Sequence, residues 1–198
     1  MFHKYSSLIL LTISIFALSC QENYIPKPRG YFRIGFPQKE YKAIDTLLPY
    51  RFEMPVYAEV LPDDTRNTQP YWINVSLTGM NAKLYISYHP VHNNLNQILE
   101  DSHELAYKHA IKADAIDEQV FINNEKKVYG IFYTIAGNAA TPMQFYLTDS
   151  VHHYLRGALY FNNNPNKDSL APVIDFLKPD IIHLIETFNW NELNRVCP

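Results

Sequence analysis

The sequence predicts an α+β domain in which a mainly antiparallel β-sheet packs against two long amphipathic helices. Several short segments alternate between apolar and polar residues, which is typical of half-buried strands. Two longer segments carry apolar residues at helical spacing. The chain of 198 residues also contains 15 Tyr and 11 Phe but only 6 Gly, a composition that favours strands with much buried surface. The order of the elements gives no strand–helix–strand repeat and therefore no parallel sheet.

The strands of the first half are marked off by proline, glycine and asparagine. We expect them at residues 31–36, 50–54, 71–77 and 83–88. Gly79 and Asn81 lie between the last two segments and predict a hairpin turn. Residues 61–70 are polar and bounded by proline, so a surface loop is expected there.

The second half supplies both helices and four more strands. The helices are predicted at about 94–113 and 169–188. The apolar stripe of the second helix stays in phase across Pro179, so one kinked helix is expected, with Asp168 or Ser169 as its N-cap. The strands are expected at 119–123, 127–135, 143–148 and 153–161. This layout is similar to the PsbP/Mog1 type of α/β sandwich.

Residues 1–19 predict a lipoprotein signal peptide. The apolar run 8–18 is shorter than the about 20 residues that a membrane span needs. It ends in Ala-Leu-Ser before Cys20, which resembles a bacterial lipobox, although leucine is commoner where Ala17 stands. Cys20 is therefore the expected site of lipidation. An ordinary signal peptide with an incidental cysteine and an uncleaved span are the alternatives.

The remaining chain is expected to divide into three parts. Residues 20–30 would form the lipidated cysteine and a proline-rich tether, residues 31–190 a single globular domain, and residues 191–198 a C-terminal tail. The only other cysteine is Cys197, so no disulfide framework is predicted. A formal charge of −3 without a cluster of Lys and Arg argues against binding of nucleic acid.

Motifs for catalysis or for a metal are not found in the sequence. His89 and His92 stand close together, but no further Cys or carboxylate ligands lie at a suitable spacing. Asp149, Ser150 and His152 are the residue types of a hydrolase triad, but the sequence around them has no glycine-rich oxyanion loop. A turn explains them more simply. We therefore expect no enzymatic activity, no metal and no cofactor, although a pair of glycosidase carboxylates would not be visible in sequence.

Two groups of residues are candidate contacts for a protein partner, because aromatic residues and arginine are enriched at interfaces. Their alternative role is in a core strand and in surface ion pairs. They are Arg29, Tyr31 and Arg33 after the tether, and Tyr154 and Arg156 in a later strand.

Three short segments resemble the Asp-(Ser/Thr)-apolar acceptor of periplasmic O-glycosylation in Bacteroidetes. In each segment, a turn or a helix cap is the alternative role of the residues. The candidate acceptors are Thr46, Ser150 and Ser169.

Longer strings are similar to the gliding-motility lipoprotein GldD family. They include YIPKPRGYFRIGFP (24–37), YGIFYTIAGNAAT (129–141) and the segments 83–116 and 144–190. The resemblance implies a cell-envelope lipoprotein of Bacteroidetes that is required for gliding and for the linked type IX secretion system. No catalytic activity is attached to the family.

The expected function is therefore that of a non-catalytic, lipid-anchored envelope protein that contacts other gliding and secretion proteins. Gln21 and Glu22 follow Cys20 where an aspartate would argue for the inner membrane, so the periplasmic face of the outer membrane is favoured, with the inner membrane left open. The alternative is a periplasmic module that binds a small ligand or peptidoglycan in an aromatic cleft between sheet and helix. A third candidate is a hydrolase of the envelope.

Overall fold

The computed structural model describes residues 34–44, 47–63, 65–108 and 113–191. The described residues from Gly35 onward belong to one compact unit. The expected signal peptide and tether lie outside the described residues. So do five of the predicted site residues, namely Cys20, Arg29, Tyr31, Arg33 and Thr46.

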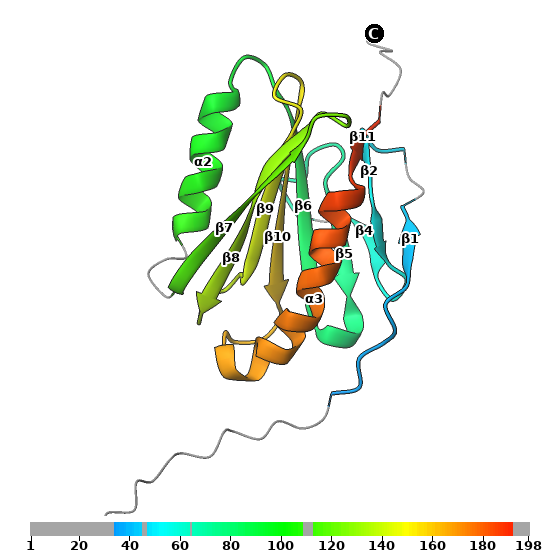
Figure 1. The fold of residues 1–198 in the computed structure, drawn as a ribbon, viewed down its shortest axis with the longest axis vertical. Coiled ribbons are helices and arrows are strands. Elements are labelled where there is room, and N and C mark those ends of the chain that lie inside the picture. The colour runs from blue at the N-terminus through cyan, green and yellow to red at the C-terminus, as the bar shows by residue number, and fades with distance from the viewer. Residues whose placement is uncertain (1–33, 45–46, 64, 109–112, 192–198) are drawn as a thin grey trace, which may run out of the picture. The chain divides into compact units, whose positions relative to one another are not determined.

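Seven strands form one sheet in which every neighbouring pair is antiparallel (Figure 1). One meander supplies the first three strands, a second meander supplies the other four, and the pairing of β6 with β10 joins them. In spatial order the strands are β4 (Glu59–Pro62), β5 (Ile73–Leu77), β6 (Ala82–Pro90), β10 (His153–Phe161), β9 (Met143–Thr148), β8 (Val128–Gly137) and β7 (Ala113–Asn123). The predicted α+β class with a mainly antiparallel sheet is confirmed.

Two short antiparallel pairs lie beside the main sheet. One joins β1 (Tyr41–Ala43) to β3 (Glu53–Pro55). The other joins β2 (Tyr50–Arg51) to β11 (Asn189–Trp190), so the end of the described chain lies beside a strand from its first part.

Helix α3 (Lys167–Thr187) packs against one face of the sheet. Its buried residues Leu177, Ile181 and Leu184 join the main hydrophobic core. The helix begins earlier than predicted, because the N-cap is Asn166, whose side chain accepts a hydrogen bond of 3.2 Å from the backbone N–H of Ser169. A short polar side chain at this position satisfies a backbone donor that has no partner within the helix.

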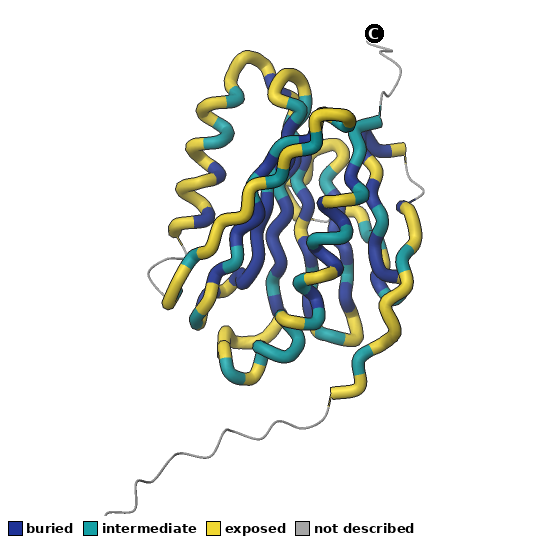
Figure 2. Tube along the Cα trace, viewed as in Figure 1, coloured by how far each residue is buried: buried dark blue, intermediate teal, exposed yellow. Residues whose placement is uncertain are grey.

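Helix α2 (Leu95–Tyr107) packs against the opposite face and is shorter than predicted, since β7 begins at Ala113. Only two of its residues are buried, Ser102 and Ala106. Ala106 clusters with Tyr133 and Ile135 of β8. Most of the predicted apolar stripe stays partly exposed, and Figure 2 shows an outward surface of the helix that is largely exposed. Of the two long amphipathic helices expected, only α3 has the predicted length.

Two further differences concern the first half of the chain. The predicted strand 31–36 is absent at its described positions 34–36, which precede β1. The predicted surface loop 61–70 begins inside a strand, because β4 extends to Pro62 and pairs with β5. No helix that the structure describes is long and apolar enough to cross a membrane.

The alternation of β10 shows what each face of the sheet carries. Leu155 and Leu159 belong to the core beneath α3. Arg156 and Tyr160 point to the other face, where α2 covers the part formed by β8 and β9. The part of that face formed by β4, β5, β6 and β10 carries a cavity instead of a helix.

Candidate functional site

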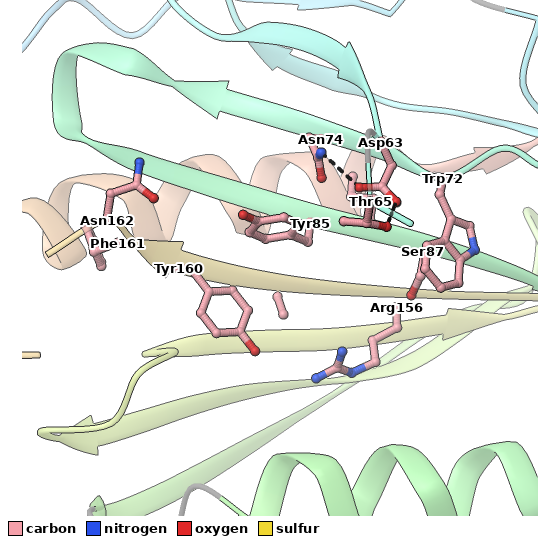
Figure 3. Close-up of a pocket in the computed structure, with 12 residues that line it drawn as sticks. Asp63, Thr65, Trp72, Asn74, Tyr85, Ser87, Arg156, Tyr160, Phe161 and Asn162 are labelled. Atoms are coloured by element: carbon pink, nitrogen blue, oxygen red, sulfur yellow. Dashed lines mark hydrogen bonds between the residues drawn. The ribbon is translucent and has the colours of Figure 1, made fainter. Parts of the chain in front are cut away.

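A cavity of about 530 Å³ lies on the sheet face opposite α3 (Figure 3). Its walls come from β5, β6, β10 and the ends of the loops that follow β4 and β10. Because these strands are neighbours in space and not in sequence, the cavity combines residues from distant parts of the chain. The side chains that matter for its chemistry are Asp63, Trp72, Asn74, Tyr85, Arg156 and Tyr160.

Two tyrosine rings form one wall of the cavity. Tyr85 and Tyr160 meet edge to face with their ring centroids 5.6 Å apart. Tyr85 is 37% exposed, and the ammonium of Lys83 lies 5.6 Å from the centroid of its ring. An exposed aromatic pair of this kind offers apolar surface and a π-face to a ligand.

Trp72 forms a second wall and is held rigidly. Its indole Nε1 donates a hydrogen bond of 2.8 Å to the backbone carbonyl of Tyr88. The residue before it, Tyr71, has a φ of 70°, a conformation that is unfavourable for a bulky side chain. The hydroxyl of the buried Tyr50 donates a hydrogen bond of 2.7 Å to the carbonyl of Tyr71. The core therefore fixes the strained turn that aims Trp72.

Asp63 gives the cavity a negative charge. Its carboxylate accepts hydrogen bonds of 2.6 Å from the hydroxyl of Thr65 and 3.2 Å from the side-chain amide of Asn74. Burial alone would raise the pKa of Asp63, but the hydrogen bonds from Thr65, Thr68 and Asn74 outweigh it and lower the pKa below its ordinary value. The carboxylate is therefore ionised at neutral pH.

Arg156 gives the cavity a positive charge. Its guanidinium donates a hydrogen bond to Oε1 of the buried Gln144, whose Nε2 has no partner among the described residues. Burial and then the charge of Arg156 lower the pKa of the neighbouring His89, so that ring is neutral at pH 7. Neither Arg156 nor Asp63 forms an ion pair with any residue that the structure describes.

Of the two predicted partner contacts that the structure describes, Tyr154 and Arg156, only Arg156 lies on the cavity. Tyr154 belongs to the same face of β10, but it is 1% exposed and its hydroxyl forms a hydrogen bond with Ser102 of α2. This position corrects the expectation of a surface contact, because α2 covers the residue. Tyr154 and Arg156 were predicted as one contact surface, but Tyr154 is covered by α2 and Arg156 lines the cavity.

The described candidates for O-glycosylation are both exposed. Ser150 lies in the turn between β9 and β10 with a φ of 70°. Ser169 lies in the first turn of α3. Their modification stays a prediction.

The segment that resembles a hydrolase triad forms a turn. The carboxylate of Asp149 accepts backbone hydrogen bonds from Val151, His152 and His153 at 3.0, 2.8 and 2.8 Å. Burial would raise the pKa of Asp149, but these bonds outweigh it and lower the pKa. Within the described part of the chain, no group of three or more His, Cys, Asp or Glu residues could hold a metal ion.

Sequence reasoning missed most of the cavity. It placed Arg156 and Tyr160 on one face of their strand, but Asp63, Trp72 and Tyr85 were expected only as parts of loops or strands. The alternation of β6 could have placed Tyr85 and Ser87 on a common face. The pairing of β6 with β10, which brings the two strands together, has no local signal.

One solved structure that matches is the solution structure of cyanobacterial PsbP (CyanoP) from Synechocystis sp. PCC 6803, at 10% identity and a TM-score of 0.49. The match covers 81% of this chain and 98% of that chain. No curated protein matches the chain.

One family model matches a part of the sequence that includes the whole main sheet and both helices. The family model for the gliding motility lipoprotein GldD matches residues 21–190. Because this match spans the described domain and extends back to the residue after Cys20, the chain belongs to the GldD family of gliding motility lipoproteins.

Proposed function

We propose that this protein is a non-catalytic binding component of the gliding machinery and of the protein secretion linked to it. Lipid on Cys20 would hold it in the cell envelope, facing the periplasm from the outer membrane, and the domain would act through contacts with other envelope proteins. One observation carries the proposal. The uncovered face of the sheet presents a cavity whose two opposite charges, Asp63 and Arg156, have no ionic partner in the described chain.

The chemistry of the cavity supports binding more than catalysis. A general acid or base works best with a pKa near the operating pH, whereas the pKa of Asp63 is lowered. Among the residues that line the cavity, Thr65 and Ser87 carry aliphatic hydroxyls, and Tyr85 and Tyr160 carry phenolic ones. The hydroxyl of Thr65 donates to Asp63, and no hydrogen bond between described residues joins Thr65 or Ser87 to a histidine. The lining is therefore suited to recognising a ligand.

The experiment for this proposal is crosslinking in intact cells. A C-terminally tagged protein is crosslinked and purified, and the proteins recovered with it are identified. Enrichment of gliding or secretion proteins that is lost in Cys20→Ala supports an anchored component that works through protein contacts. Recovery of the tagged protein alone, at full expression, contradicts it.

A second candidate is a module that binds a small ligand or peptidoglycan, which the cavity itself favours. Ligand pockets of about 300–1,000 Å³ commonly combine aromatic walls with a few convergent polar groups, and this cavity has that size and composition. The expected cleft between sheet and helix is replaced by one lined by strands and loops. Sedimentation of the protein with purified sacculi tests this function, and equal sedimentation without sacculi contradicts it.

A further inference from the structure

Asp63 and Arg156 lie at opposite sides of one row of residues across four strands. Pro62 pairs with Ile73, Ile73 with Ile86, and Ser87 with Arg156. If the antiparallel register is continued by one residue, Asp63 faces Trp72 and Trp72 faces Ser87, which pairs with Arg156. These four residues form one row across the strands. Three interstrand spacings of about 4.8 Å separate the ends of this row by roughly 14 Å.

The two charges at the ends of the row are held in place by neutral groups. Thr65 and Asn74 donate to Asp63, and Gln144 accepts from Arg156. These contacts orient the charged side chains without neutralising them. The cavity therefore carries a fixed negative charge at one end and a fixed positive charge at the other.

Apolar surface lies between the two charges. Trp72 belongs to the row itself, and Figure 3 shows Tyr85 to one side of it, with Tyr160 beyond. Aromatic rings at this position favour a ligand with apolar or amide groups in its middle. Both ends of the row remain open to charged groups of the ligand.

We propose that the cavity binds a short zwitterionic peptide, with its ammonium group at Asp63, its carboxylate at Arg156 and its middle against Trp72 and Tyr85. An extended chain covers about 3.3–3.6 Å per residue, so three or four residues span the row. The inference deepens the proposed binding function and rests on it. Free peptides carry these two charges at their ends. Peptidoglycan stems are joined to the glycan through their N-terminus and carry the ammonium group on the side chain of a diamino acid instead, together with a terminal carboxylate.

Other ligand classes fit the charges less well. A neutral glycan would cover Asp63 and Arg156 without supplying an opposite charge to either, and desolvation of an unpaired charge is unfavourable. A polyanion would be repelled by Asp63, and a polycation by Arg156. A ligand with one charge of each sign, separated by an apolar middle, satisfies both ends.

The test is calorimetric titration of the full-length protein in detergent with the tetrapeptide Ala-Phe-Ala-Ala in three forms. The forms are the free peptide, the N-acetylated peptide and the C-amidated peptide. Each cap removes one charge, so each capped form should bind about tenfold more weakly than the free peptide. Equal binding of all three forms, or no binding of the free peptide, overturns the proposal.

Two variants assign the ends of the peptide. In Asp63→Asn, acetylation of the peptide should no longer weaken binding, whereas amidation still should. In Arg156→Gln, amidation of the peptide should no longer weaken binding, whereas acetylation still should. In Arg156→Lys, amidation should again weaken binding in part, because the lysine keeps the positive charge. Asp175→Asn and Arg51→Gln remove exposed charges outside the cavity and should bind all three forms like the wild type. Melting curves of each variant confirm that it is folded.

Sacculi distinguish the two sources of the peptide. Binding to intact sacculi that is lost after an amidase removes the stems identifies the stems, whereas binding of the tetrapeptide alone identifies free peptides. Equal binding to stripped sacculi points to the glycan and overturns the proposal.

The crosslinking experiment separates this inference from the proposed function. If the wild type does not bind the peptide but Asp63→Asn still captures envelope proteins, only the peptide site is refuted. If the wild type binds the peptide but captures no envelope protein, only the partner contacts are refuted.

Discussion

Gly157 of β10 and Phe145 of β9 are a register pair, and the ring of Phe145 occupies the space that a side chain at position 157 would need. A Cβ at this glycine would lie 2.3 Å from two carbons of the ring. Phe145 is 1% exposed and belongs to the main core. The absence of a side chain at Gly157 is therefore what allows a large ring to lie flat against the centre of the sheet.

Gly157→Ala should lower the free energy of unfolding by about 1–3 kcal/mol, because the ring of Phe145 must move within a filled core. Urea unfolding measures the change. The matched control is Gly79→Ala, where nothing lies within 4 Å of the added Cβ. If Gly157→Ala lowers the free energy of unfolding no more than Gly79→Ala does, the ring of Phe145 can move without cost and the prediction is wrong.

Asp180→Ala should destabilise the domain by about 3 kcal/mol, since it removes a buried carboxylate that accepts two tyrosine hydroxyls and pairs with the half-buried Lys39. Asp180 is 3% exposed, lies 2.7 Å from Nζ of Lys39, and accepts hydrogen bonds from the hydroxyls of Tyr41 and Tyr57. Chemical unfolding measures the effect. Asp175→Ala, on an exposed position of the same helix, should change stability by less than about 0.5 kcal/mol. Similar losses in both variants would contradict the prediction.

The domain should lose stability as the pH falls below the ordinary pKa of histidine. Burial lowers the pKa of His89 and of His153, so the unfolded chain binds protons at a higher pH than the folded one does. Stability is therefore complete above the unfolded pKa of about 6.5 and falls below it.

Thermal melting from about pH 7.5 down to about pH 5.5 measures this loss. The double variant His89→Gln with His153→Gln should show a smaller fall in melting temperature than the wild type. His92→Gln, at an exposed position, should keep the full fall. An unchanged pH profile in the double variant would remove these two histidines from the explanation.

Tyr154→Phe should loosen α2 and leave the rest of the domain intact. The hydroxyls of Tyr154 and Ser102 form a buried hydrogen bond, and its loss leaves Ser102 unsatisfied at a cost of about 1–3 kcal/mol. Relative to the wild type, the amide hydrogens of Leu95–Tyr107 should therefore exchange faster, whereas those of α3 should exchange at an unchanged rate. Tyr160→Phe, on the same face of β10, is the control. Equal exchange in both variants would contradict a role of this bond in holding the helix.

Much of the fold could be predicted because its determinants are local. Alternating residues and turn-forming residues predicted the hairpin β5–β6, the strands β8 to β10 and the last five residues of β7, and a continuous apolar stripe predicted α3. Helix α2 was predicted too long because its spacing of apolar residues does not say how many of them reach the sheet. The two residues of the helix that are buried, Ser102 and Ala106, are small, and only one of them is apolar.

The candidate site could be predicted only in fragments. The alternation of β10 placed Arg156 and Tyr160 on one face, but the enrichment of aromatic residues and arginine at interfaces suggested that Tyr154 is a surface contact. Only the position of α2 shows that Tyr154 is covered. Asp63 and Trp72 join the cavity through the pairing of β4 and β5 with β6, which depends on contacts between strands across the whole sheet.

The contact between Lys39 and Asp180 has a mechanical consequence. Residues that precede Gly35 connect to the domain through the segment that carries Phe36 and Lys39. Phe36 stacks on Phe176 of α3 at 4.2 Å, and Lys39 is paired with Asp180 four residues further along that helix. Tension arriving from the N-terminal side is thus borne first by the attachment of this segment to α3, and the hydrogen bonds of the main sheet are loaded only after that attachment yields.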